Sequence, residues 1–507
     1  MTPDEVLKQT YEQVPYVTNP HELSNPTRFS VVARLFSLHC PRVNAARILE
    51  IGCASGGNLN PLAYSLPHAQ FVGVDLAEAH IKSATADAAT LGLKNVEYRL
   101  SDFRSLGKQL GQFDYIIAHG IYSWISAEAQ PEMLKFIAES LKPDGVAYVS
   151  YNVYPGWANH EQMRNLMRFH VRDAADAVSI VKGAREIVEF VSSAIPEELS
   201  SHSNTLANIN ALISKTMGQQ LLHDHLEVHN NPVYFYEFAS KASHAGLRYV
   251  GDALFGSMGS LELSPEMRQK LHEYSGGQIV QTEQYLDFIR NRSFRQTLLC
   301  HKSREMNRTV HPSTVFQCAM ATQLQASTSS PDMTEGAAVE FMLPGSRAKV
   351  VVTSSLVKHA LRILEAAWPT SMAFNDLISS VKQKMAGKQS NSIEEQLSGM
   401  VLELYAKAVL MLFSVGPKLE ITYGAAPRPF APGKLYAARQ QSTVNAYHQA
   451  VVLNDFNRMV LTSLDGQKTL EQITNELTGK VTPEKGSLKD AVASAVEKLY
   501  SYALIEA

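Results

Sequence analysis

Short apolar runs alternate with amphipathic, helix-like stretches through the first 152 residues of the chain. Runs such as FDYIIAHG are almost continuously apolar, which is typical of strands buried on both faces of a parallel sheet. The pattern also predicts a helix at 131–141 that ends in a Lys-Pro-Asp-Gly turn at 142–145. We therefore expect a doubly wound α/β fold. The predicted strands lie at residues 48–51, 71–74, 96–103, 113–120 and 145–152, with a further helix at 58–66.

Helical patterns interrupt this alternation between residues 158 and 228. The stretch is too long for a simple crossover, so we expect a helical insertion. The alternation then resumes with a helix at 231–247, which begins with an Asn-Pro pair, and with strands at 247–254 and 294–302. We expect the first domain to span residues 1–305 and to include the insertion at about 158–228.

The remaining 200 or so residues differ in kind. Two segments share the order helix, short turn, helix, gap, helix, and the strand-like sequences KVVV and LEITY lie around the first of them. A linker rich in Pro, Gly and Ala, at 424–434, separates the two segments. The pattern predicts two mainly α, winged-helix-like domains at 306–425 and 426–507, in the manner of a degenerate repeat.

A glycine-rich turn follows the first predicted strand, in the sequence ILEIGCASGGN at 48–58. A second apolar run, QFVGVD, ends in Asp75. A strand, a glycine turn, a helix and a strand that ends in an acid form the layout of a nucleotide site. The spacing of Gly52 and Gly56 departs from the dinucleotide fingerprint. With Glu50 before the first glycine, the turn resembles motif I of class I S-adenosylmethionine (SAM) methyltransferases.

That resemblance implies roles at the carboxyl edge of the sheet. Gly52 and Gly56 give the cofactor access to the backbone. Asn58, where the next helix opens, is expected to donate to the carboxylate of the cofactor, aided by the positive end of that helix. Asp75 is expected to accept from the ribose hydroxyls, and Asp102 from the adenine amino group. The remaining positions expected around the cofactor are Glu50, Cys53, Leu76, Phe103, His119 and Gly120, the last two beneath the sulfonium.

Aromatic residues concentrate in two loops that would emerge above the methyl group of the cofactor, HGIYSW at 119–124 and SYNVYPGW at 150–157. Aromatic walls stabilise an approaching ammonium, so the loops favour an amine as methyl acceptor. We predict that the catalytic residues are Tyr122, Trp124, Asn152 and Tyr154. The alternative is that these aromatic rings pack the insertion onto the sheet.

Composition narrows the class of protein further. A chain of 507 residues with 45% hydrophobic and 19% charged residues is an ordinary globular protein of several domains. The net charge of −3 offers no electrostatic case for nucleic acid or an anionic membrane. Four scattered cysteines fit a reducing compartment, and neither a signal peptide nor a membrane span is expected, so we predict a cytoplasmic protein. Its histidine-rich segment HDHLEVH at 223–229 lacks ligand spacing, and we predict no metal.

The order of motifs becomes specific when they are taken together: YEQVPY, GCASGGN, AHGIYSWI, AYVSYNVYPGW, NPVYFYEF and FRQTLLCHK. The sequence resembles the bacterial methyltransferases that carry a methyltransferase regulatory domain, a family that includes protein-lysine methyltransferases of outer-membrane surface proteins. The resemblance implies a Rossmann-like sheet of seven strands with strand seven antiparallel, and SAM as the cofactor. It also implies that YEQVPY folds over the cofactor, with Tyr11 and Tyr16 near it. Ala54 departs from the family's frequent GCGxG.

The leading hypothesis is a SAM-dependent protein-lysine N-methyltransferase whose partner is a protein substrate, as a monomer or homodimer. A small-molecule N- or O-methyltransferase is the first alternative, although small acceptors rarely need two appended domains. A non-catalytic SAM-sensing regulator that binds DNA or a partner is the second. The helix predicted at 468–478 carries one Lys and two Glu, which is a poor match for phosphates.

Overall fold

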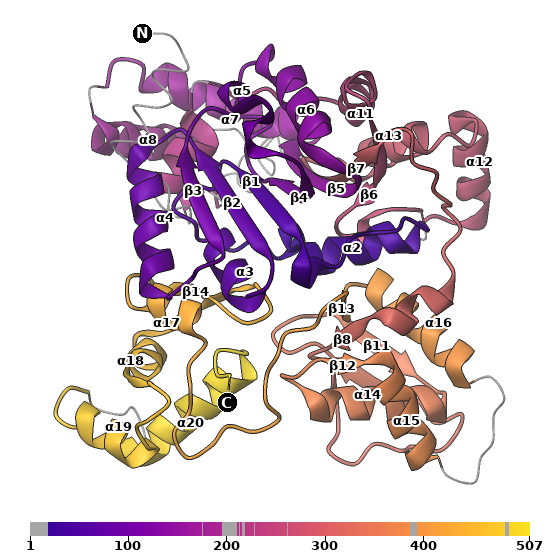
Figure 1. The fold of residues 1–507 in the computed structure, drawn as a ribbon, viewed down its shortest axis with the longest axis vertical. Coiled ribbons are helices and arrows are strands. Elements are labelled where there is room, and N and C mark those ends of the chain that lie inside the picture. The colour runs from indigo at the N-terminus through magenta and orange to yellow at the C-terminus, as the bar shows by residue number, and fades with distance from the viewer. Residues whose placement is uncertain are drawn as a thin grey trace.

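A computed structural model of the 507-residue chain shows a Rossmann-like part with two smaller parts packed below it in the view of Figure 1. No helix in the described residues is long and apolar enough to cross a membrane. The structure describes residues 19–174, 176–194, 210–211, 213–214, 218–227, 229–260, 262–385, 393–481 and 486–506.

A seven-stranded sheet organises the first part, with the strand order β3-β2-β1-β4-β5-β7-β6. Strand β7 runs antiparallel to both β5 and β6, and the other neighbours are parallel, which confirms the predicted fold class. All six residues of the central strand β4 are buried, as its apolar run predicted. The strands are β1 Arg47–Ile51, β2 Gln70–Asp75, β3 Val96–Leu100, β4 Phe113–Ala118, β5 Leu141–Asn152, β6 Leu247–Asp252 and β7 Phe294–His301.

Helices cover both faces of this sheet and enclose two separate cores. On one face, Phe29 of α2 packs on Tyr115 and Tyr148. On the other face, Tyr151 stacks on Phe238 of α11. Helix α2 begins cleanly because Asn25 accepts from the backbone N–H of Thr27 and Pro26 occupies the first turn. The helices are α2 Pro26–Leu35, α3 Leu59–Ser65, α4 Glu78–Thr90, α5 Phe103–Leu106, α6 Ala129–Ser140, α11 Phe235–His244, α12 Pro265–Ser275 and α13 Ile279–Arg290.

The region between β5 and α11 is helical, as predicted. Helices α7 (Trp157–His170) and α8 (Ala177–Ala194) enclose a small core of their own around Met163, Met167 and Val188. Helix α10 (Gly218–Leu221) leads into a π-helical turn at Leu222–Leu226. The predicted turn at 142–145 is wrong: β5 starts directly after α6, and these residues form its irregular beginning beside β4.

The middle part contains the predicted three helices, α14 (Ser355–Ala367), α15 (Phe374–Lys384) and α16 (Ile393–Ala406). KVVV forms strand β11 (Lys349–Val352), which pairs with β10 (Val339–Met342). LEITY is not a strand. The residues that pair instead are those of β13 (Met411–Phe413), because their apolar side chains are buried against β8. The remaining strands here are β8 Ala319–Ala321, β9 Gln325–Ala326 and β12 Met372–Ala373.

The last part holds the second predicted set of three helices, α18 (Asp455–Ser463), α19 (Leu470–Leu477) and α20 (Leu488–Ser501). A hairpin of β14 (Ser442–Val444) and β15 (Ala450–Val452) precedes them. The predicted linker at 424–434 is partly wrong, because α17 (Ala431–Ala437) begins inside it. Pro432 lies in the first turn of α17, where its missing N–H costs nothing.

Candidate active site

The turn after β1 brings the backbone of β1 and β2 together. The N–H groups of Gly52 and Cys53 both donate to the carbonyl of Val74, at 2.7 and 3.1 Å. Gly52 has a φ of +68°, and a Cβ there would lie 2.1 Å from Cδ1 of Ile121. The position therefore accepts only glycine. Because the Cys53 side chain is buried, its backbone and not its thiol lines the turn.

Gly56 closes the turn and is equally constrained. Its φ is +76°, and an added Cβ would lie 2.7 Å from the hydroxyl of Tyr98 and 2.9 Å from Nδ2 of Asn60. Gly56 is therefore required where the turn packs against Tyr98 and Asn60. The helix that follows opens directly behind the turn, as it does in a nucleotide-binding fold.

Asp75 organises the opposite side of the turn from the end of β2. Its Oδ2 accepts from the N–H of Ala54 at 2.9 Å, and its Oδ1 accepts from the N–H of Ala77 at 2.9 Å and faces Nδ1 of His80 at 3.1 Å. Ala54 has a φ of +41°, in the region that favours glycine. The bond to Asp75 holds this strained alanine in place. Asp75 therefore shapes the turn in addition to any bond with ribose.

Glu50 and Asn58 form a buried pair beside the turn. Nδ2 of Asn58 donates to Oε1 of Glu50 at 2.7 Å, and both side chains are almost inaccessible. Oε2 of Glu50 has no hydrogen-bond partner in the described residues. Burial raises the pKa of Glu50 to about 8. A buried carboxylate oxygen without a donor calls for a cation, and the ammonium of the amino-acid end of SAM would satisfy it.

Asn58 connects three segments. Its Nδ2 also donates to Oγ of Ser24 at 3.1 Å, while its Oδ1 accepts from the N–H of His21 at 2.9 Å and from Nε2 of His448 at 2.7 Å. Both amide protons of Asn58 are thus engaged. Asn58 holds Glu50, whereas we expected Asn58 to donate to the cofactor itself. No sequence pattern indicated His448, which lies 390 residues away from Asn58 in the chain.

His119 and Gly120 follow β4 at the same edge of the sheet. The His119 ring stacks on that of His21 with centroids 3.5 Å apart, and its Nδ1 lies 2.9 Å from the Tyr148 hydroxyl. Burial lowers the pKa of His119 well below its ordinary value and that of His21 to about 4, so both rings are neutral at neutral pH. Gly120, with a φ of +64°, has open space where a Cβ would point.

The expected cofactor positions Asp102, Phe103 and Leu76 differ in how accessible they are. Asp102 caps α5 through the N–H of Arg104 at 2.8 Å and pairs with the Arg104 guanidinium at 2.6 Å. Phe103 is turned into the core, where it packs on Phe136. Leu76, by contrast, is exposed next to Asp75. Of these three expected cofactor positions, Leu76 and the half-exposed edge of Asp102 are accessible.

These residues fit the cofactor. A turn that requires glycine at two positions, an acid at the end of β2, a partnerless buried carboxylate oxygen and an open Gly120 meet at the carboxyl edge of the sheet. Tyr11 and Tyr16, expected to cover the cofactor, lie outside the described residues.

The aromatic loops are split between core and site. Tyr122 is buried, and its ring packs edge-on against Tyr151 and Phe238. In this structure it supports the sheet from the core, where we expected an open wall. The core alternative thus applies to Tyr122 and Tyr151. The Tyr122 hydroxyl has no partner in the described part of the chain.

The other predicted catalytic residues are Trp124, Tyr154 and Asn152. Trp124 is half-buried and meets Trp157 edge-on, with centroids 6.4 Å apart. The half-buried Tyr154 donates to Oε2 of Glu161 at 2.7 Å. Asn152 ends β5, and its buried Nδ2 is without a partner among the described residues. Trp124 and Tyr154 are thus partly exposed, whereas the buried Asn152 and Tyr122 each keep a polar atom without a partner in the described residues.

The histidine-rich segment bonds within itself and to α7, where Arg168 donates to the carbonyl of Glu227 at 2.9 Å. Nδ1 of His223 faces Oε1 of Glu227 at 3.1 Å, within the π-helical turn region. Within the described ranges, no three His, Cys, Asp or Glu side chains gather into a group that could hold a metal.

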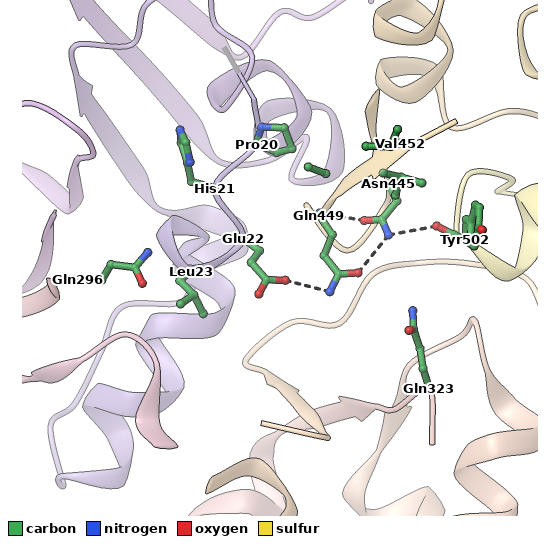
Figure 2. A pocket seen from close by; sticks show the side chains of 12 residues that line it. Pro20, His21, Glu22, Leu23, Gln296, Gln323, Asn445, Gln449, Val452 and Tyr502 are labelled. Atoms are coloured by element: carbon green, nitrogen blue, oxygen red, sulfur yellow. Dashed lines mark hydrogen bonds between the residues drawn. The ribbon is translucent and has the colours of Figure 1, made fainter. Parts of the chain in front are cut away.

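A cavity of about 680 Å³ opens where the three parts of the chain meet. Figure 2 shows His21 and Glu22 on one side and Asn445, Gln449 and Tyr502 on the other. The polar side chains of Gln296 and Gln323 complete the lining. Because His21 also stacks on His119, the cavity adjoins the carboxyl edge of the sheet.

Three family models match the chain along its length. They are a methyltransferase domain at residues 48–145, a predicted methyltransferase regulatory domain at 218–301 and a PKMT C-terminal winged helix domain at 427–500. The last match confirms the winged-helix prediction for the C-terminal part. The chain belongs to the bacterial class I SAM-dependent methyltransferases that carry a methyltransferase regulatory domain, and SAM is its cofactor.

Individual relatives agree with this placement. Protein RP789 of Rickettsia prowazekii is 30% identical over 486 residues, which are 94% of this chain and 87% of the relative. Protein RP028 of the same organism is 32% identical over 46% of this chain and 94% of its own length. The solved structure of PKMT2 from Rickettsia typhi in complex with AdoHcy is 26% identical, has a TM-score of 0.88 and covers 97% of this chain and all of PKMT2.

Proposed function

We propose that this enzyme transfers methyl groups from SAM to the side-chain amines of lysines in a protein substrate. The observation that carries the proposal is the likeness to PKMT2, which extends over 97% of the chain and so includes the middle and C-terminal parts. Those parts add about 200 residues to a fold that already holds the cofactor site. A small acceptor does not need them, whereas a protein acceptor needs a surface.

The acceptor path that we propose begins at the cavity in Figure 2. Its lining includes the side chains of Gln296 and Gln323, whose carboxamide oxygens can accept from an extended peptide. The lysine side chain would pass His21 toward His119 at the end of β4. This placement supports a substrate that is recognised by its backbone.

The chain's own residues would then align the lysine amine. SAM supplies an electrophilic methyl group on its sulfonium, and the lysine must lose a proton to solvent and arrive as a neutral amine. The Tyr154 hydroxyl donates a hydrogen bond to Glu161, so its oxygen keeps lone pairs that can accept from an N–H of that amine. Trp124 offers a ring face to the positive charge that develops on the amine as the methyl group is transferred. Asn152, at the end of β5, is the third residue that we propose contacts the amine.

We propose three domains, at residues 1–305, 306–425 and 426–507, with the helical insertion at about 158–228. Separate buried clusters around Leu49, Val188 and Val460 support the division of the first domain, its insertion and the last domain. We also propose a cytoplasmic location. All four cysteines lie in described residues and are free and buried, which suits a reducing compartment.

The proposal is tested with purified enzyme, SAM that carries a radiolabelled methyl group and a crude bacterial lysate. The products are separated into protein and small-molecule fractions. We expect label in discrete protein bands, and none when Gly52→Val enzyme is used, because a side chain at Gly52 collides with Ile121. Label confined to the small-molecule fraction would replace the proposal with a small-molecule N- or O-methyltransferase.

A further inference from the structure

The hairpin of the C-terminal domain reaches the cofactor turn. His448 sits between β14 and β15, is 3% exposed and donates from Nε2 to Oδ1 of Asn58 at 2.7 Å. Asn58 in turn donates to Glu50, whose other oxygen is buried beside the glycine turn and has no partner among the described residues. A continuous chain of hydrogen bonds therefore runs from the C-terminal domain to the carboxylate beside the cofactor.

Hydrogen bonds at the tip of this hairpin fix the position of His448. The carboxamide oxygen of Asn445 accepts from the N–H groups of Tyr447 and Gln449, at 3.0 and 2.9 Å. The N–H of His448 donates to the carbonyl of Asn445 at 2.9 Å, and His448 adopts a φ of +61°. A non-glycine residue in this region costs free energy, and it persists because its surroundings hold it there.

The donor state of His448 follows from its surroundings. Burial lowers the pKa of His448 to about 3, so the ring is neutral at neutral pH and carries one proton. Oδ1 of Asn58 is an acceptor, because Nδ2 of the same amide donates to the Glu50 oxygen. The single proton of His448 is therefore on Nε2.

The same domain is fastened to the two helices that flank the turn. Arg439 pairs with the buried Asp87 of α4 at 2.7 Å, and the Tyr64 hydroxyl of α3 lies 3.1 Å from Oε2 of Glu506. Figure 1 shows α17 and β14 directly beside α3 and α4. Nε2 of Gln449 also donates to Oε2 of Glu22 at 2.9 Å, a bond drawn in Figure 2. The C-terminal domain thus contacts Asn58 at the start of α3, Tyr64 near the end of α3, and Asp87 of α4.

We infer that the C-terminal winged-helix domain is part of the SAM site, with His448 as a positioning residue that acts through Asn58 on Glu50. Cofactor binding and docking of this domain are then coupled. Coupling is reciprocal, so a protein that binds the C-terminal domain also changes the affinity for SAM. The inference rests on the cofactor site alone and not on the identity of the acceptor.

The test measures binding of S-adenosylhomocysteine, the demethylated cofactor, by calorimetry to the full-length chain. We expect His448→Ala to raise the Kd about tenfold, the size expected for losing one buried hydrogen bond. His448→Gln, which also carries an N–H donor, is expected to stay within about threefold of the natural chain. An unchanged Kd for folded His448→Ala, or no rescue by His448→Gln, would overturn the inference.

The matched control is Ser442→Ala. Ser442 Oγ donates to Oδ1 of Asn19 at 3.3 Å, which is another hydrogen bond between the same two domains but without contact to Asn58. We expect the Kd of Ser442→Ala to remain within about twofold of the natural value. A Kd as high as that of His448→Ala would show a general loss of docking and contradict a specific role for His448.

Hydrogen exchange on the unaltered chain decides the matter even if His448→Ala does not fold. Saturation with S-adenosylhomocysteine is expected to slow amide exchange in residues 442–452 at least about threefold, because coupling stabilises the docked hairpin. Unchanged exchange in these residues, with protection confined to the turn at 50–58, would contradict the coupling.

Discussion

Nδ2 of Asn58 donates to Oε1 of Glu50 across 2.7 Å, and the second oxygen of that carboxylate has no partner among the described residues. The pair is buried, so Glu50 carries a pKa raised to about 8 in the absence of a cation. We propose that the amino-acid end of SAM binds here, because its ammonium would restore the charged carboxylate.

The first prediction replaces that carboxylate. Glu50→Gln keeps the size of the side chain and removes its charge, so we expect the Kd for S-adenosylhomocysteine to rise about 30-fold, which corresponds to about 2 kcal/mol for one charged hydrogen bond. Calorimetry measures the Kd. The control is Glu97→Gln, an exposed acid on β3. Equal affinities for Glu50→Gln and the natural chain would exclude this contact.

The second prediction concerns the strained turn. Ala54 adopts a φ of +41°, which an alanine reaches only at a cost. Ala54→Gly removes that strain but adds freedom to the unfolded chain, and the balance is expected to raise stability by about 1 kcal/mol. Thermal unfolding of the two proteins at equal concentration tests this. A lower midpoint for Ala54→Gly would show that the alanine side chain contributes packing that outweighs its strain.

The third prediction addresses the regulatory domain. Arg295 is fully buried and bonds to Asp252, Glu283 and Asp287 at 2.8, 3.0 and 2.8 Å. Arg295→Met leaves these three acids without their central cation, so we expect a loss of about 3–5 kcal/mol of stability. Denaturant unfolding measures it. An exposed arginine on β3, Arg99→Met, is the control and is expected to change stability by less than about 0.5 kcal/mol.

The fourth prediction is a dependence on pH. Burial lowers the pKa of His448 to about 3, so the unfolded chain binds this proton more tightly than the folded chain does. The contribution of His448 to stability is complete above the unfolded pKa of about 6.5 and is lost as the pH falls toward 3.

We therefore expect the thermal midpoint of the natural chain to fall more steeply between pH 6.5 and about 4.5 than that of His448→Gln, which cannot titrate. Calorimetric scans across this range compare the two slopes. Parallel slopes would mean that His448 takes up its proton in the folded chain near its ordinary pKa.

The sequence predicted the sheet and its cofactor turn well because both depend on local pattern. Runs such as Phe113–Ala118 are apolar without interruption, and the glycines at 52 and 56 mark positions where a side chain collides with its surroundings. The same local signals placed the helices of the last part, apart from α17 inside the predicted linker.

The wrong predictions concern residues whose surroundings depend on contacts with distant parts of the chain. Tyr122 looked like a wall of the site, but Phe238 of α11 packs against its ring and makes it core. Asn58 looked like a free donor, but Ser24 and Glu50 take both of its protons. His448 has no local signature, since only the docked C-terminal domain brings it to the turn.

The most direct test of the central claim is the chemical identity of the methylated residue. Protein labelled by the enzyme is hydrolysed completely to amino acids, and the labelled species is identified by chromatography and mass spectrometry. The account predicts that the label is in N-methylated lysine. Label in another amino acid, or label that base releases as from a methyl ester, would contradict lysine as the acceptor.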